Sequence, residues 1–219
     1  KDHPSKVDIG PINTVISNNY IDGWRLRASA QTTANLHPHL FLKGYYAYGF
    51  KDQQSKYMAE VEYSFNKKEY LPREFPKNSL TFTYKYDNSV PSDKYISTDK
   101  DNVFTAWKVC TVDQYNYERK ASVKYELEQE TGLKTTVSLS HVNYEPCGKL
   151  FYRTMAGEQA LQQAISNGTI SGNEFISSPY NVHDITMAEA TVGLRYAPGE
   201  TFINTKQRRL PVNLDAPVF

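Results

Sequence analysis

Strict alternation of apolar and polar side chains over long segments is the feature that most constrains this chain. Residues 56–65 show it most clearly, because alternate positions carry Tyr, Ala, Val and Phe while the positions between them include two glutamates. Successive side chains of a β-strand point to opposite faces, so this segment has one apolar and one charged face. Residues 40–50 are equally rich in Tyr and Phe, and the short polar link between the two segments predicts a β-hairpin.

The same alternation recurs along most of the chain and predicts an all-β, antiparallel, up-and-down protein of about seven to eight strands. The predicted strands span residues 23–31, 40–50, 56–65, 79–87, 114–128, 133–144 and 184–196, with a further candidate at 103–109. Residues 1–19 are interpreted as a lead-in and residues 197–219, which prolines interrupt, as an irregular tail. One short helix is expected at residues 157–165, inside a long loop that covers residues 145–183. We treat residues 1–219 as a single domain.

Composition excludes several classes of protein. The chain has 25 basic and 24 acidic residues among 219, so it offers no electrostatic case for a nucleic-acid partner. A mean hydropathy of −0.62 and the lack of any long apolar run exclude a helical membrane protein. They are compatible with a membrane β-barrel, because half of every barrel strand faces a polar interior.

Two details of the chain leave alternatives open. The sequence begins without Met or a signal peptide, and we interpret it as a mature chain or a fragment of a longer protein. Cys110 and Cys147 lie far apart on expected loops, where they form either one disulfide or two separate thiols.

Strand length, aromatic placement and loop length favour a membrane barrel. Strands of soluble sandwiches are typically about 5–6 residues long, whereas membrane barrel strands need about 9–11, and most of the strands predicted here reach that length. Tyr and Phe gather near strand ends, as in the interfacial girdles of outer-membrane barrels. With seven strands, the two longest links fall on the same side of the sheet, as extracellular loops do. A true strand at 103–109 would move one of them to the other side.

The alternative is a soluble β-barrel or sandwich that binds a small ligand or glycan, with its apolar faces packed inward.

In a membrane barrel the charged faces of the strands would line the interior. Two arginines on one strand face, Arg25 and Arg27, are costly in lipid and therefore predict a lumen or polar core on that side. The predicted lumen-facing residues are Arg25, Arg27, Glu60, Glu62, Lys85, Lys124, Glu126, Glu189 and Arg195.

Residues 17–33, 44–50, 63–76 and 195–219 together resemble a family of Gram-negative, Bacteroidetes-type outer-membrane β-barrels of uncharacterised function. Its members usually carry an N-terminal carboxypeptidase-regulatory-like domain, and they are much longer than this chain. The resemblance implies an interior slice of the barrel region, a bacterial outer-membrane location, and outer-membrane lipid and other envelope proteins as partners. It supplies no catalytic residues. The segment 28–33 lacks the glycines usual in the family, and residues 145–183 match nothing in it.

Candidate catalytic and metal-binding groups are few. Glu60 and Glu62 share a strand face, as paired carboxylates of glycoside hydrolases can, but solvated lumen residues are the favoured interpretation. His37 and His39 lack a nearby third ligand for a metal, and Ser140 and His141 point to opposite strand faces, which excludes a nucleophile–base pair. We therefore expect no enzyme activity, no cofactor and no metal, and a role in transport, envelope assembly or scaffolding.

One loop is a candidate for partner binding. Tyr70, Leu71 and Phe75 lie between charged residues at a strand end, and the tail adds basic residues. Exposed apolar residues in such a place can bind a partner domain or lipid head groups. The alternative is a loop that packs against the barrel rim. The tail residues are Lys206, Arg208 and Arg209.

Overall fold

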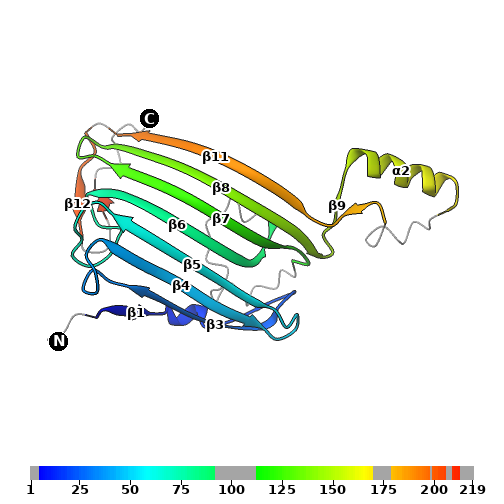
Figure 1. Ribbon diagram of the computed structural model, residues 1–219, viewed down its shortest axis with the longest axis horizontal. Helices are drawn as coiled ribbons and strands as arrows, with labels where there is room; N and C mark the ends of the chain where they lie inside the picture. Colours follow the sequence, from blue (N-terminus) through cyan, green and yellow to red (C-terminus); the bar gives the residue numbers. More distant parts are fainter. Residues whose placement is uncertain (1–4, 92–111, 170–178, 198, 206–208, 213–219) are drawn as a thin grey trace.

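One antiparallel sheet dominates the computed structural model, which describes residues 5–91, 112–169, 179–197, 199–205 and 209–212 (Figure 1). The candidate strand at 103–109 lies outside the described residues, as do Cys110, Lys206 and Arg208. The strands of the sheet are β1 (Val7–Ile9), β2 (Ile16–Asn19), β3 (Gly23–Thr32), β4 (Leu40–Gly49), β5 (Ser55–Ser64), β6 (Lys77–Ser89), β7 (Gln114–Glu128), β8 (Leu133–Gly148) and β11 (Ile185–Tyr196).

All seven predicted strands are present, as β3 to β8 and β11. The largest difference is at the end of β8, which continues beyond residue 144 to Gly148. It does so because residues 144–148 still pair with the start of β7, as in Gly148 opposite Gln114. From β3 to β8 each strand pairs with the next in sequence, and β11 pairs with β8. The prediction of an all-β, antiparallel, up-and-down fold is confirmed.

The segment predicted as a lead-in is an edge strand in two parts. β1 and β2 both pair with β3, at Val7–Thr32 and at Asn19–Gly23, and a 3-10 turn at Ile12–Thr14 separates them. Pro11 precedes that turn and has no N–H to donate to a neighbouring strand. Gly10 adopts a φ of +112°, a backbone conformation that favours glycine over other residues. The break between β1 and β2 therefore follows from this Gly-Pro pair.

The links between strands alternate between the two ends of the sheet, as predicted. Residues 33–39, 65–76 and 129–132 lie at one end, and the strand ends that the two longest links join, at residues 89 and 114 and at residues 148 and 185, lie at the other. β6 and β7 are antiparallel and pair directly with each other from Lys77–Glu128 to Ser89–Asn116. The parity of the predicted links therefore holds.

The sheet is open among the described residues, since β1 and β2 form one edge, β11 forms the other, and the two edges do not pair. The finer prediction of a closed barrel is therefore still a prediction. In the part of the chain that the structure describes, no helix is long and apolar enough to cross a membrane.

The smaller elements lie beyond the ends of the sheet. Helix α2 (Met155–Ser166) is capped at its N-terminus by Thr154, whose hydroxyl accepts a hydrogen bond from the Gly157 amide at 3.1 Å, and it is slightly longer than predicted. Figure 1 shows α2 projecting past the sheet next to β9 (Tyr152–Arg153), which pairs with β10 (Asn181–Val182). The predicted irregular tail contains a short hairpin, β12 (Phe202–Asn204) with β13 (Arg209–Pro211).

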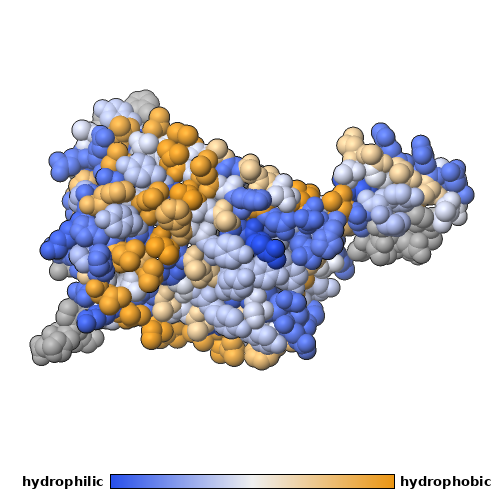
Figure 2. All heavy atoms as spheres, in the orientation of Figure 1, coloured by the Kyte–Doolittle hydropathy of each residue, from blue (hydrophilic) through white to orange (hydrophobic). Residues whose placement is uncertain are grey.

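Burial on the two faces of the sheet is the reverse of that in a typical soluble protein. On the apolar face, large side chains are open to solvent, with exposed fractions of 64% for Trp24, 59% for Leu139 and 70% for Val192. Figure 2 shows orange surface over the short-turn half of the strands and mostly pale-blue to blue surface over the half nearer the long-loop end. On the polar face, Arg25 and Lys56 are fully buried. The core of this fold is therefore largely polar.

Candidate functional site

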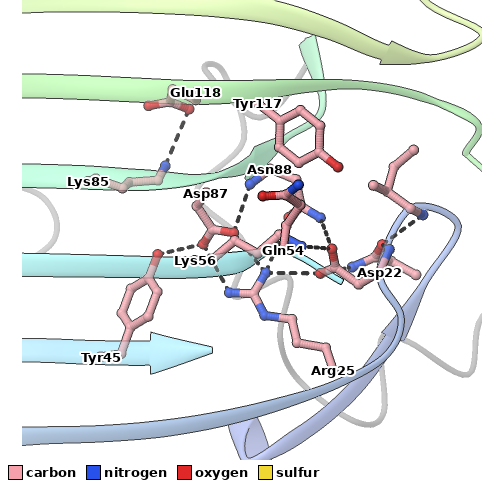
Figure 3. A network of polar contacts seen from close by, with 12 residues as sticks. Asp22, Arg25, Tyr45, Gln54, Lys56, Lys85, Asp87, Asn88, Tyr117 and Glu118 are labelled. Carbon is pink, nitrogen blue, oxygen red and sulfur yellow. Dashed lines mark hydrogen bonds and ion pairs between the residues drawn. The ribbon is translucent and has the colours of Figure 1, made fainter. Parts of the chain in front are cut away.

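A buried network of charges lies on the polar face near the long-loop end of the sheet (Figure 3). The Arg25 guanidinium contacts the Asp87 carboxylate at 2.8 and 3.0 Å and Asp22 at 3.3 Å. The Lys56 ammonium lies 2.6 Å from Asp22 and also pairs with Asp52. Asn88 donates to Asp22 at 2.9 Å. Every formal charge in the network thus has a partner of opposite sign.

The ends of several strands bring this network together. Arg25 is near the start of β3, Lys56 near the start of β5 and Asp87 near the end of β6, and antiparallel order places these positions at the same end of the sheet. β3 and β6 are separated by two strands, and neighbouring strands lie about 4.8 Å apart. The Arg25–Asp87 contact therefore spans a curved, concave polar face.

Asp22 is held in place by the turn that precedes β3. The side chain of Asn19 accepts hydrogen bonds from the amides of Ile21 and Asp22, at 3.0 and 2.8 Å, which is the usual way that Asn stabilises a tight turn. Burial alone would raise the pKa of Asp22, but hydrogen bonds from Lys56 and Asn19 and the charges of Lys56 and Arg25 outweigh it and lower that pKa. Asp22 is therefore a carboxylate at neutral pH.

The nine predicted lumen-facing residues all lie on the polar face, but the structure does not gather them at one place. Arg25 alone joins the buried network. Glu62 pairs with Lys77, which also lies 3.8 Å from Glu126, while Glu189 is exposed on the edge strand β11. Other ion pairs that involve these residues include Lys85–Glu118, Lys124–Glu126, Lys134–Glu126 and Arg195–Glu200.

Sequence reasoning missed five members of the network: Asp22, Asp52, Lys56, Asp87 and Asn88. The alternation does assign Lys56 and Asp87 to the polar face, since they are an even number of positions from Glu60 and Lys85, respectively. No local signal identifies their partners, because Arg25 and Asp87 are separated by 62 positions.

A cavity of about 440 Å³ is the second feature of the polar face. It lies over β3, β4 and β5, where Arg27, Lys43, Glu60 and Glu62 line it, and residues 71–73 close one side. Three predicted lumen residues, Arg27, Glu60 and Glu62, thus line one cavity. The volume is within the usual range for small-ligand sites, about 300–1,000 Å³.

The loop at residues 65–76, which contains the predicted partner-binding residues, is folded against the end of the sheet. The Glu74 carboxylate accepts hydrogen bonds from the amides of Glu69, Tyr70 and Leu71 at 2.7, 2.7 and 3.0 Å. The Tyr70 hydroxyl donates to Asp8 at 2.7 Å.

The tail hairpin packs on this same loop. The guanidinium carbon of Arg209 lies 4.0 Å from the centre of the Phe75 ring, and Arg209 also pairs with Glu128 at 2.8 Å. Tyr70, Leu71 and Phe75 are half-buried. These contacts agree with the second interpretation of this loop, in which it packs at the end of the strands, rather than with a loop that exposes its apolar residues to a partner.

Lys68 is buried in the 65–76 loop and gives it a pH dependence. Its ammonium donates to the backbone oxygens of Glu74 and Pro76, and burial, with a smaller effect from the like charge of Lys77, lowers the pKa of Lys68 to about 8. In the unfolded chain the pKa is about 10.4, so between pH 8 and 10.4 the unfolded state binds more protons. We expect the contribution of Lys68 to stability to rise with pH across this window.

Comparing the wild-type chain with a Lys68→Met variant measures this contribution. The unfolding free energy of the wild type minus that of the variant is expected to increase between pH 7.5 and 10.5. The variant corrects for other groups that titrate at high pH. A difference that stays constant, or that falls with pH, would contradict the expected shift in the pKa of Lys68.

The remaining candidates have structural roles or none that the geometry reveals. The His37 ring accepts hydrogen bonds from the amides of His39 and Leu40, at 3.2 and 3.0 Å, and stabilises the turn before β4. Ser140 and His141 point to opposite faces of β8, as their alternation predicted. Among the described residues, no group of three or more His, Cys, Asp or Glu side chains is placed to hold a metal ion.

Comparisons with protein-family models, with curated proteins and with solved structures found no match to this chain. The resemblance to an outer-membrane barrel family therefore stays a prediction, and the geometry of the two faces carries the functional argument.

Proposed function

We propose that this chain forms part of the wall of a bacterial outer-membrane β-barrel, with its apolar face toward lipid and its polar face toward the barrel interior. The observation that carries the proposal is the reversed burial of the two faces. In water, a sheet that exposes Trp24, Leu139 and Val192 while burying Arg25 and Lys56 would present a large apolar patch, which soluble monomers rarely do. The alternative, a soluble β-barrel or sandwich, requires the apolar face to be buried and the polar face to be exposed to water.

Aromatic rings near both ends of the apolar face support a membrane orientation. Near the long-loop end Tyr57, Tyr86 and Tyr117 form a chain of ring contacts with centroids 5.9 and 6.1 Å apart. Near the short-turn end Tyr63 and Phe65 contact each other at 5.3 Å. From Tyr57 to Phe65, at about 3.3 Å per residue, the strand covers roughly 26 Å, close to the apolar band of about 25 Å in outer-membrane barrels, although strand tilt shortens its height.

In this proposal the open edges of the sheet pair with further strands. Backbone N–H and C=O groups at the edge of a sheet would each cost several kcal/mol if they met hydrocarbon without a partner, so membrane-spanning sheets close. If this chain is an interior slice of a longer barrel, as the resemblance implies, the rest of that barrel provides such strands. We assign the protein to the outer membrane on this basis, with its lipid as the first partner.

A non-catalytic role in transport, envelope assembly or scaffolding fits the polar face best. Glycoside hydrolysis needs one carboxylate as a proton donor and a second as a nucleophile or base. Glu62 is instead ion-paired with Lys77, which leaves Glu60 without a matched second carboxylate.

The test is to refold the 219-residue chain in plain buffer, in detergent and in lipid vesicles, and to record circular dichroism and heat-modified gel migration. We expect β-structure and a heat-dependent shift in migration only with detergent or lipid. A monodisperse protein that melts cooperatively in plain buffer would overturn the proposal, because the apolar face would then be covered by protein.

A further inference from the structure

We infer that the apolar face carries a binding site for a lipid with an anionic phosphate head group, in which Arg119 and His141 hold the phosphate and a groove beside them holds an acyl chain. The inference rests on the proposed function and deepens it, because it names the class of lipid and the residues that bind it. The groove crosses strands β5 to β8 and β11 and has a volume of about 690 Å³.

Small side chains on the apolar face form the floor of this groove. Ala59, Ala121 and Ala188 lie in one row across the sheet, because Tyr84 pairs with both Ala59 and Ala121, and His141 pairs with both Ala121 and Ala188. The next row toward the short-turn end borders the groove with larger apolar side chains, those of Val61, Phe82, Val123 and Leu139. Alternation places the side chains of the other bordering residues, Thr83, Ser122, Ser140 and Glu189, on the polar face. This part of the groove therefore offers an apolar surface that suits an acyl chain.

The end of the groove nearer the long loops is polar. Arg119 lies two positions before Ala121 on the same face of β7, about 7 Å away along the strand. Because Ala121 pairs directly with His141, Arg119 is the diagonal neighbour of His141, and the two side chains are both exposed. A surface that changes from cationic to apolar along a groove matches an amphiphilic molecule, with its head group at Arg119 and its chain toward Leu139.

Arg119 is positioned by an aromatic ring and forms no ion pair with any residue that the structure describes. Its guanidinium carbon lies 5.6 Å from the centre of the Tyr86 ring, within the range of a cation–π contact. On the long-loop side of Arg119, the carboxylates of Glu145 and Asp184 lie 3.9 and 3.7 Å from the ring of His183. These two acidic residues are thus paired with a residue other than Arg119, and Arg119 is the charged side chain of this face that lies beside the groove.

A lipid phosphate is the anion that this site suits in a membrane. An arginine on a lipid-facing surface is costly unless its guanidinium reaches the interface, where it can donate two parallel hydrogen bonds to a phosphate. The imidazole N–H of His141 can donate another. Tyr57 and Tyr86 lie in the same row as Arg119, and tyrosine rings are typical of the boundary between lipid and water. The phosphate and the acyl chain therefore belong to one molecule, a lipid.

The experiment is native mass spectrometry of the chain refolded in micelles of an uncharged detergent. Dioctanoyl phosphatidic acid is the probe, dioctanoylglycerol is the control with the same chains but no phosphate, and inorganic phosphate is the control without chains. We expect phosphatidic acid to bind at least about tenfold more tightly than either control, because it alone makes both the charge-assisted hydrogen bonds and the apolar contacts. Equal binding of phosphatidic acid and dioctanoylglycerol would overturn the inference. Inorganic phosphate that binds as tightly as phosphatidic acid would overturn it too, since the site would then be one for a free anion.

Variants at three successive positions of β7 separate the two parts of the site. Arg119→Gln is expected to weaken the binding of phosphatidic acid about tenfold and to leave the binding of dioctanoylglycerol unchanged. Ala121→Leu fills the floor of the groove and is expected to weaken the binding of both lipids several-fold. Lys120→Gln, whose side chain is on the polar face, is the matched control and should change neither affinity. Equal affinities in all three variants would contradict the site.

These outcomes are distinct from failure of the proposed function. A chain that folds in detergent but binds the two lipids equally would lose the lipid site and keep its membrane orientation. A chain that folds cooperatively in plain buffer, with its apolar face covered by protein, would lose both.

Discussion

Arg25→Met is expected to lower the unfolding free energy by about 3–5 kcal/mol, the usual cost of removing one partner from a buried ion pair. Arg25 is fully buried between Asp22 and Asp87, so its loss leaves their carboxylates without their guanidinium partner in a site that excludes water. Urea unfolding of the refolded protein, followed by circular dichroism, measures the change. A loss below about 1 kcal/mol would show that the network contributes no more than a surface pair.

The control for this variant is Lys124→Met. Lys124 is on the same face, but its side chain is 43% exposed and pairs with Glu126 at 3.1 Å, so its removal should change stability by at most about 1 kcal/mol. A second variant, Asp87→Asn combined with Arg25→Met, should recover part of the loss. The coupling between the two changes then measures the Arg25–Asp87 interaction itself.

Leu139→Arg is expected to destabilise the protein in lipid by about 2–4 kcal/mol, the cost of an arginine on the lipid face near the middle of a barrel strand. Leu139 is on the apolar face of β8 and is 59% exposed. If this face met water instead, the same substitution would change stability by no more than about 0.5 kcal/mol. Unfolding of the protein in lipid vesicles by urea measures the difference.

Thr191→Arg is the matched control for Leu139→Arg. Thr191 is on the neighbouring strand β11, exposed, and on the polar face, where an arginine would meet water in the proposed orientation. We expect little change from it. If the two arginine variants were equally stable in vesicles, the apolar face would not be in contact with lipid.

Local sequence was sufficient for the strands and for the composition of their faces. Alternation in a strand has a period of two and depends on no distant residue, so residues 114–128 were predicted with the bounds that β7 has. The same reasoning assigned Glu60 and Lys85 to one face. It failed where an element depends on its neighbours: β1 and β2 are too short to show alternation, and they form only because β3 offers an edge.

The sequence by itself determined that this chain is a meander of long, two-faced strands, because side-chain alternation and turn residues are local properties. Only the tertiary structure decided which face is buried, which charges meet and where a cavity lies. Arg25 finds Asp87 across two intervening strands, and the 65–76 loop meets the tail through Phe75 and Arg209. These contacts follow from the curvature of the sheet and the return of distant segments, and no periodicity along the chain encodes them.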